Sequence, residues 1–173
     1  MNRLLALALV FAASPTCAGV IEGRVIEVPD GATVTILSRE GASMHRVRLA
    51  GIEAPARDRA HGNSSRESLR RLTVGKPVRV ETNAIDPKGV LIGTVLVVRS
   101  EKECGGQPCA PILDPGLSQL SFGWAVIDQA NLARQPESSR RQYAIAEEQA
   151  RASRAGLWRV PNFRINTEVV QAR

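Results

Sequence analysis

The sequence is poor in aromatic residues. Its 173 residues include two tryptophans, one tyrosine and three phenylalanines, about 3% of the chain, which argues against a broad platform of rings for stacking bases. Histidine is scarce as well, and neither His45 nor His61 has an evident acidic partner. We therefore expect both histidines at surface or hydrogen-bonded positions. Trp124 and Trp158 stand beside predicted helix ends, where core packing suits them best.

The sequence also lacks an apolar run long enough to span a bilayer comfortably. The apolar stretch from Leu4 to Ala13 follows the basic Arg3 and precedes small residues that end at Ala18. It is shorter than a membrane-spanning helix requires, and the whole segment has the pattern of a secretory signal peptide. We expect residues 1–18 to be removed on export. The mature protein is then periplasmic or secreted, and not an integral membrane protein.

Cysteine is limited to three residues, of which Cys17 falls within the signal segment. Cys104 and Cys109 remain in "CGGQPC", and an even pair in an exported chain predicts a disulfide. Its small ring would contribute roughly 2 kcal/mol in the chain-entropy model. Such a pair could also be half of a zinc site, but no second Cys or His pair completes one, so we favour the disulfide.

The charge of the chain is +6, and only Arg3 is lost with the signal segment. A positive balance favours anionic partners such as nucleic acid, lipopolysaccharide or anionic lipid, and charge alone does not choose between them. Arg66, Arg70 and Arg71 form a basic patch only if they converge in space.

Alternation of apolar and polar residues predicts five strands. In the third, Val47 and Leu49 fall on one face while Arg46 and Arg48 fall on the other. The predicted strands cover residues 20–28, 32–37, 45–52, 77–82 and 90–98.

Three helices are predicted from their start signals. Ser64 and Glu67 match a capping box, Asp114 precedes Pro115, and Ser139 precedes Gln142 by three residues. One helix between the third and fourth strands, with two more after the fifth, indicates an α+β fold that is mainly a β barrel. We expect a five-stranded Greek-key barrel of the OB type. A generic α+β sheet is the alternative.

Five motifs then occur in a recognisable order, and they make the chain resemble the staphylococcal nuclease-like (thermonuclease) family from about residue 20 to residue 159. The resemblance implies one domain over residues 19–160, followed by a C-terminal extension over 161–173. The motifs are "DGATV" from Asp30, "RLAGIEAPA" from Arg48, "DPKGV" from Asp86, "GWA" from Gly123 and "YAIAEEQARASRAGLW" from Tyr143.

Active members of this family bind calcium with carboxylates and grip the phosphate with two arginines. In this chain the resemblance places Arg48 at the first arginine, and Glu53 at a metal-binding aspartate. Asp30 is the other acid retained for a metal. Three positions depart from the pattern: Ala32 replaces an aspartate, Ala56 replaces the glutamate that acts on water, and Val90 replaces the second arginine.

These departures predict a loss of hydrolysis. Calcium takes six to eight oxygen ligands, and a missing general base costs about 10² to 10⁴ in rate. We therefore expect an exported binding module with no cofactor. Its partner would be nucleic acid, bound through phosphate contacts, or a protein.

Two other functions stay open. In one, the chain is an active calcium-dependent endonuclease that cleaves DNA or RNA with a rearranged site, in which Asp58 substitutes for the base. In the other, it is a structural or assembly module of the cell envelope, and residues 102–111 contact a partner protein. Arg48 itself could hold a phosphate or form an ion pair with Asp30 or Glu53.

Overall fold

The computed structural model describes residues 19–99, 103, 110–133, 135–161 and 163–165. The predicted signal peptide and both cysteines of the predicted disulfide lie outside the described residues, as does most of segment 102–111. Within the described ranges, no helix is both long enough and apolar enough to cross a membrane.

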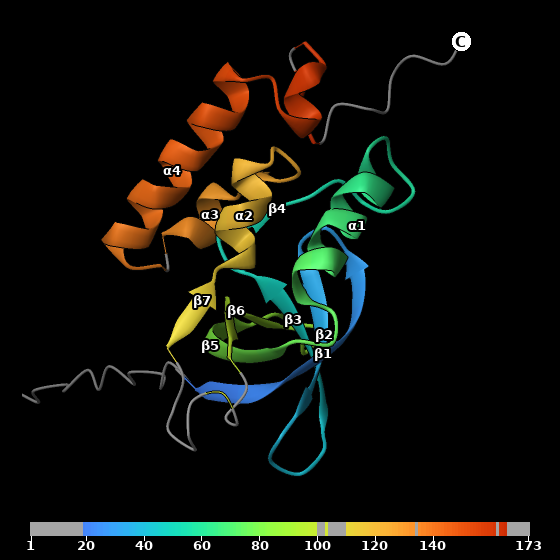
Figure 1. The fold of residues 1–173 in the computed structure, drawn as a ribbon, viewed down its shortest axis with the longest axis vertical. Helices are drawn as coiled ribbons and strands as arrows, with labels where there is room; N and C mark the ends of the chain where they lie inside the picture. The colour runs from blue at the N-terminus through green and yellow to red at the C-terminus, as the bar shows by residue number, and fades with distance from the viewer. Residues whose placement is uncertain (1–18, 100–102, 104–109, 134, 162, 166–173) are drawn as a thin grey trace, which may run out of the picture.

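A five-stranded barrel forms the lower half of the molecule in Figure 1. The strand order is β3-β2-β1-β5-β6, and β3 also pairs with β6 in parallel, which closes the barrel. A short strand, β7, continues the sheet beyond β6. The predicted OB-type barrel is thereby confirmed. The barrel strands are β1 (Val20–Asp30), β2 (Thr33–Ser38), β3 (Met44–Leu49), β5 (Pro77–Ile85) and β6 (Leu91–Val98), with β7 at Pro111–Leu113.

Alternation along the strands fills the barrel as the sequence pattern predicts. Val47 and Leu49 of β3 are buried, whereas Arg46 and Arg48 are exposed. Val34 and Ile36 of β2 are fully buried in the same core. The apolar interior is therefore supplied by one face of each strand, and the basic residues of β3 remain outside it.

Helices gather over one end of the barrel, with α1 and α4 on either side of α2 (Figure 1). Helix α1 packs on β1, and α2 packs on both α1 and α4. A second, two-stranded sheet joins β4 to β8. These elements are β4 (Ile52–Glu53), α1 (Gly62–Thr73), α2 (Pro115–Ser121), β8 (Val126–Ile127), α3 (Gln129–Leu132), α4 (Glu137–Ala152) and the 3-10 helix η2 (Gly156–Arg159).

The helices differ from the prediction in number and in their start points. Helix α3 is a fourth α-helix, capped by Asp128, whose carboxylate accepts hydrogen bonds from two backbone N–H groups. Helix α1 begins after His61, so the predicted capping box at Ser64 is wrong. Helix α4 begins after Pro136 rather than at Ser139. Capping boxes are short patterns that also arise by chance inside a helix, and tertiary contacts decide where the first turn forms.

The start of α2 is confirmed at Asp114, whose Oδ1 accepts a hydrogen bond from Leu117 N at 3.0 Å. The Tyr143 hydroxyl, from α4, donates to Asp114 Oδ2 at 2.9 Å. Burial raises the pKa of the Asp114 carboxyl, although both hydrogen bonds act in the opposite direction. Burial and the adjacent carboxylate also raise the pKa of Tyr143. This pair links α2 to α4 at the edge of the core.

The raised pKa of Asp114 predicts a pH dependence of stability. The folded protein binds the proton more tightly than the unfolded chain, so the contribution of this group falls as pH rises above about 3.9, the unfolded value. Asp114→Asn keeps a capping oxygen and does not titrate. The free energy of unfolding of the variant minus that of the wild type should therefore rise as the pH is raised from about 3 to about 7. Urea unfolding at several pH values measures this, and a constant difference would contradict it.

Candidate functional site

The turn between β1 and β2, residues 30–32, lies between two other segments of the barrel end. On one side runs β3, where Thr33 of β2 is paired with Arg48, and Leu49 N donates to Ala32 O at 2.8 Å. On the other side lies the segment that follows Glu53. A Cβ placed on Gly31 would stand 2.8 Å from Ala54 Cβ. The fold therefore brings the three predicted segments together at one place.

Within the turn, Asp30 and Ala32 have different surroundings. Asp30 Oδ1 accepts a hydrogen bond from Ala32 N at 2.9 Å, which closes the turn. The Ala32 methyl group belongs to the hydrophobic core and is only 6% exposed. Asp30 thus retains one carboxylate oxygen for other contacts, and position 32 offers no polar group.

Arg48 reaches the surface from β3, while its neighbours Val47 and Leu49 anchor the strand in the core. Its guanidinium makes no hydrogen bond or ion pair with any other residue that the structure describes. The ion pair with Asp30 or Glu53 that the sequence left open is therefore not formed. Arg48 is available to an anionic ligand.

Glu53 lies at the end of β4, where it is paired with Val126 of β8 and is exposed. The chain then turns twice in succession. Arg59 N donates to Ala56 O at 2.9 Å, and Gly62 N donates to Arg59 O at 3.0 Å. Ala56 and Asp58 are both exposed on this loop. Glu53 and Asp58 are thus the carboxylates that the segment presents to solvent.

Val90 is brought to the same barrel end by the closing strand. Asp86 Oδ1 accepts a hydrogen bond from Val90 N at 2.8 Å in a tight turn, and β6 begins at the next residue. In the parallel register of β6 with β3, Leu91 is paired with Val47 and Ile92 with Arg48. Val90 therefore adjoins the strand that carries Arg48, and its side chain contributes no charge there.

A residue that the sequence analysis missed holds the turn in place. Gln119 of α2 is fully buried, and its Nε2 donates to Gly31 O at 2.9 Å and to Ser65 O at 3.0 Å. Ser65 Oγ in turn donates to Trp124 O at 2.6 Å. One side chain thereby connects the turn, α1 and α2. The sequence signal that could have indicated this role of Gln119 is an uncharged amide next to Leu120, on the otherwise apolar face of a short helix.

The family model described as Staphylococcal nuclease homologue matches residues 46–160, more than half of the chain. The chain belongs to this family. It is 31% identical over 158 residues to the protein ParB of Escherichia coli, covering 91% of this chain and 82% of the relative. It is 29% identical over 160 residues to the micrococcal nuclease of Shigella flexneri, covering 92% and 86%. It is also 32% identical to an uncharacterized endonuclease of Escherichia coli O157:H7, covering 55% and 61%.

These comparisons correct one prediction. The expectation of a binding module that has lost hydrolysis is wrong, because a relative that aligns with 92% of this chain is named a micrococcal nuclease and a further relative is named an endonuclease. The prediction relied on Ala32, Ala56 and Val90 alone, and it assumed that the phosphodiester chemistry of the family requires the replaced groups at those three positions.

The calcium cradle expected from the nuclease family does not fit the carboxylates present. Nowhere in the described ranges do three or more His, Cys, Asp or Glu side chains gather where they could hold a metal ion. Asp30 and Glu53 remain as the two acids at matching positions, and Asp30 already gives one oxygen to the Ala32 N–H. Calcium takes six to eight oxygen ligands. Asp30 and Glu53 supply too few oxygens for such a set.

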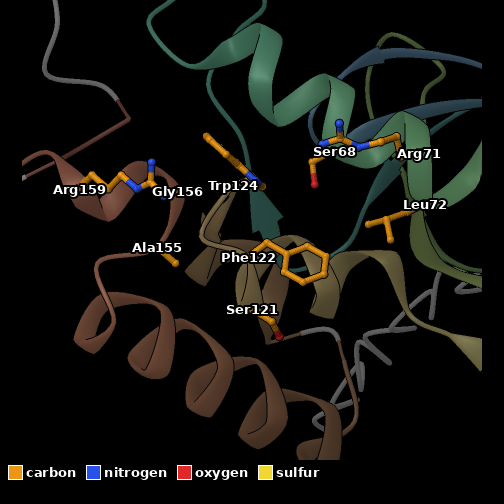
Figure 2. Close-up of a pocket in the computed structure, with 9 residues that line it drawn as sticks. All are labelled: Ser68, Arg71, Leu72, Ser121, Phe122, Trp124, Ala155, Gly156 and Arg159. Carbon is orange, nitrogen blue, oxygen red and sulfur yellow. The ribbon is translucent and has the colours of Figure 1, made fainter.

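A cavity of about 440 Å³ lies elsewhere on the nuclease fold, between α1, the end of α2 and η2 (Figure 2). None of the predicted site residues lines it. Trp124 does line it and is only partly buried, so its predicted role in the core is wrong.

Gln119 provides a test of how the turn is held. Gln119→Leu keeps a similar volume but leaves Gly31 O without this donor. We expect a loss of about 1–3 kcal/mol in the free energy of unfolding, because a buried acceptor becomes unpaired. Thermal and urea unfolding measure it, and Gln149→Leu, at an exposed position of α4, is the control. An unchanged stability would show that Gln119 does not support the turn.

Proposed function

We propose that this protein is a nuclease that hydrolyses phosphodiester bonds in DNA or RNA. The observation that carries the proposal is Arg48, an exposed guanidinium with no partner among the described residues, beside the Asp30–Ala32 turn of a staphylococcal nuclease fold. The names of its relatives support the same chemistry. Because Ala32, Ala56 and Val90 supply no ligand, base or cation, we propose a rearranged site.

Arg48 would bind the scissile phosphate. A guanidinium presents a rigid fork of N–H donors that matches two phosphate oxygens at once. As water adds to phosphorus, negative charge grows on the equatorial oxygens, and a fixed cation stabilises that transition state more than the ground state. Since β3 is held by buried neighbours on both sides of Arg48, the side chain starts from a rigid strand.

Glu53 would act on the attacking water. It is the exposed carboxylate at the end of β4, in the segment that lies against the Asp30–Ala32 turn. A carboxylate placed there can accept the proton that water loses as its oxygen bonds to phosphorus. The ester P–O bond opposite the attacking water then breaks, and the leaving alkoxide takes a proton from solvent. Asp58, on the following loop, is the alternative base in the same segment.

Export would deliver this activity to nucleic acid outside the cytoplasm. The signal-like segment 1–18 and the cysteine pair Cys104 and Cys109 support the proposal. In that compartment the positive charge of the protein would steer it toward polyanions.

The decisive measurement is cleavage of DNA and RNA by purified residues 19–173, with calcium, with magnesium and with a chelator. We expect cleavage, and we expect Arg48→Ala to lower kcat by about 10² to 10³ because a transition-state donor is lost. Arg141→Ala, which removes an exposed guanidinium of α4, is the charge-matched control. No cleavage of either nucleic acid under any of the three conditions would refute the proposed function.

The assignment of the base is tested by two variants of one segment. We expect Glu53→Gln to lower kcat by about 10² to 10⁴ and Asp58→Asn to retain most of the activity. Single-turnover cleavage measured across pH separates the two, because loss of the base removes the acidic limb of the profile. The reverse pattern, with Asp58→Asn inactive and Glu53→Gln active, would move the base to Asp58.

A further inference from the structure

An open cavity lies between α1, α2 and η2. Its volume of about 440 Å³ falls within the roughly 300–1,000 Å³ typical of small-ligand pockets. One wall comes from α1, and the opposite wall comes from Ala155, Gly156 and Arg159 (Figure 2). Phe122 and Trp124 lie between these walls in the same view.

Close backbone contacts with Gly123 fix the wall that η2 forms. Leu157 N donates to Gly123 O at 2.8 Å. A Cβ on Gly123 would stand 2.3 Å from Ala155 O, and one on Gly156 would stand 2.4 Å from Gly123 O. Only glycine allows the two segments to cross this closely. The wall is therefore set by the backbone before any ligand binds.

The cavity carries positive charge from two elements. Arg71 of α1 and Arg159 of η2 both line it, and none of its described lining residues is acidic. Neither guanidinium makes a hydrogen bond or ion pair with another residue in the described part of the chain. The nearby Glu67 is hydrogen-bonded to Arg70 instead, at 2.9 Å and 3.2 Å. Such a pocket favours an anion.

The basic patch suggested by the sequence does not form as one cluster. Arg66 donates to Val28 O at 2.7 Å, Arg70 is paired with Glu67, and Arg71 lines the cavity. The three side chains therefore have three different surroundings. Arg71 is the member that remains available to a ligand, and its counterpart is Arg159 rather than a neighbour on its own helix.

Two aromatic rings give the cavity a second property. Phe122, the C-terminal cap of α2, is 51% exposed, and Trp124, which lines the same cavity, is only half-buried. In a chain with 3% aromatic residues, two rings in one cavity form a local stacking surface. Flat ring faces next to unpaired guanidinium groups suit a ligand that combines a planar ring with an anionic group.

We propose that this cavity binds one nucleotide unit of a single-stranded nucleic acid, with its phosphate held by Arg71 and Arg159 and its base stacked on Phe122. The choice of a nucleic acid strand rests on the proposed function. Ser65, which shares Gln119 with the Asp30–Ala32 turn, is six residues from Arg71 on α1, about 9 Å along the helix axis. In this proposal the cavity is a second contact for a strand engaged at Arg48.

Binding is measured by fluorescence anisotropy with a labelled oligothymidylate and with an abasic strand of equal length, both made with phosphorothioate linkages that resist cleavage. We expect the wild type to bind oligothymidylate about fivefold or more tightly than the abasic strand, because a base stacks on Phe122. Phe122→Ala should remove this difference. Arg71→Ala combined with Arg159→Ala should weaken both strands and reduce the slope of log K against log salt by about 0.7, the value for one phosphate contact.

Arg70→Ala is the matched control, since it removes a cation from the same helix but not from the cavity lining. Melting temperatures verify that each variant is folded. Equal binding of the two strands by the wild type, or an Arg70→Ala effect as large as that of the cavity arginines, would overturn the proposal. If thymidine monophosphate competes as strongly as the strand does, the site takes a free nucleotide, and the proposed contact with a strand is wrong. Displacement by inorganic phosphate or anionic vesicles alone would overturn the role of the base.

The two proposals fail separately. Binding that depends on Phe122 and the two arginines, in a protein that cleaves nothing, would refute the nuclease and retain the cavity. Cleavage by the wild type, with binding that is unchanged in every cavity variant, would refute the cavity and retain the nuclease.

Discussion

The close packing around Gly31 is the constraint on which the candidate site depends. A single Cβ at this position would stand 1.8 Å from Ser65 Oγ and 2.8 Å from Ala54 Cβ, so the turn, α1 and the segment after Glu53 meet where no side chain fits. Gln119 then binds the carbonyl groups of Gly31 and Ser65. Because these contacts fix the turn against its neighbours, Arg48 and Glu53 extend from a defined frame rather than from independent loops.

Charge is distributed on this frame in an uneven way. Several arginines are neutralised locally, as when Arg79 pairs with Glu22 at 3.2 Å and Arg151 pairs with Glu147 at 3.0 Å. The Arg79–Glu22 pair is exposed to solvent and contributes little to stability, whereas Glu147 is buried. Arg48, Arg71 and Arg159 have no such partner among the described residues. A polyanion can therefore contact the positive charge of the chain at particular positions on the surface. The net charge does not reveal where these positions are.

The corrected prediction shows how comparison of residues with a family motif can mislead. Ala32 is a core residue here, and its methyl group packs where a carboxylate would be costly to bury. The loss of that ligand is therefore tied to the packing of this barrel as well as to chemistry. Exposed carboxylates at Glu53 and Asp58 stand in the same segment as Ala56, and a motif comparison position by position gives them little weight.

The sequence by itself determined which strand faces are buried, because residues in strands such as β3 alternate strictly, and it determined the start of α2 through Asp114 and Pro115. It predicted the barrel, and the parallel pairing of β3 with β6 closes it. The resemblance to the family also drew attention to Arg48, Glu53 and the three departures from the motif. Only the tertiary structure decided that Gln119 holds the turn, that Arg48 has no acidic partner in the described chain, and that Phe122 and Trp124 share a cavity with Arg71 and Arg159. The physical reason is distance along the chain. These contacts join residues that are tens of positions apart, and local periodicity carries no information about which distant elements pack together.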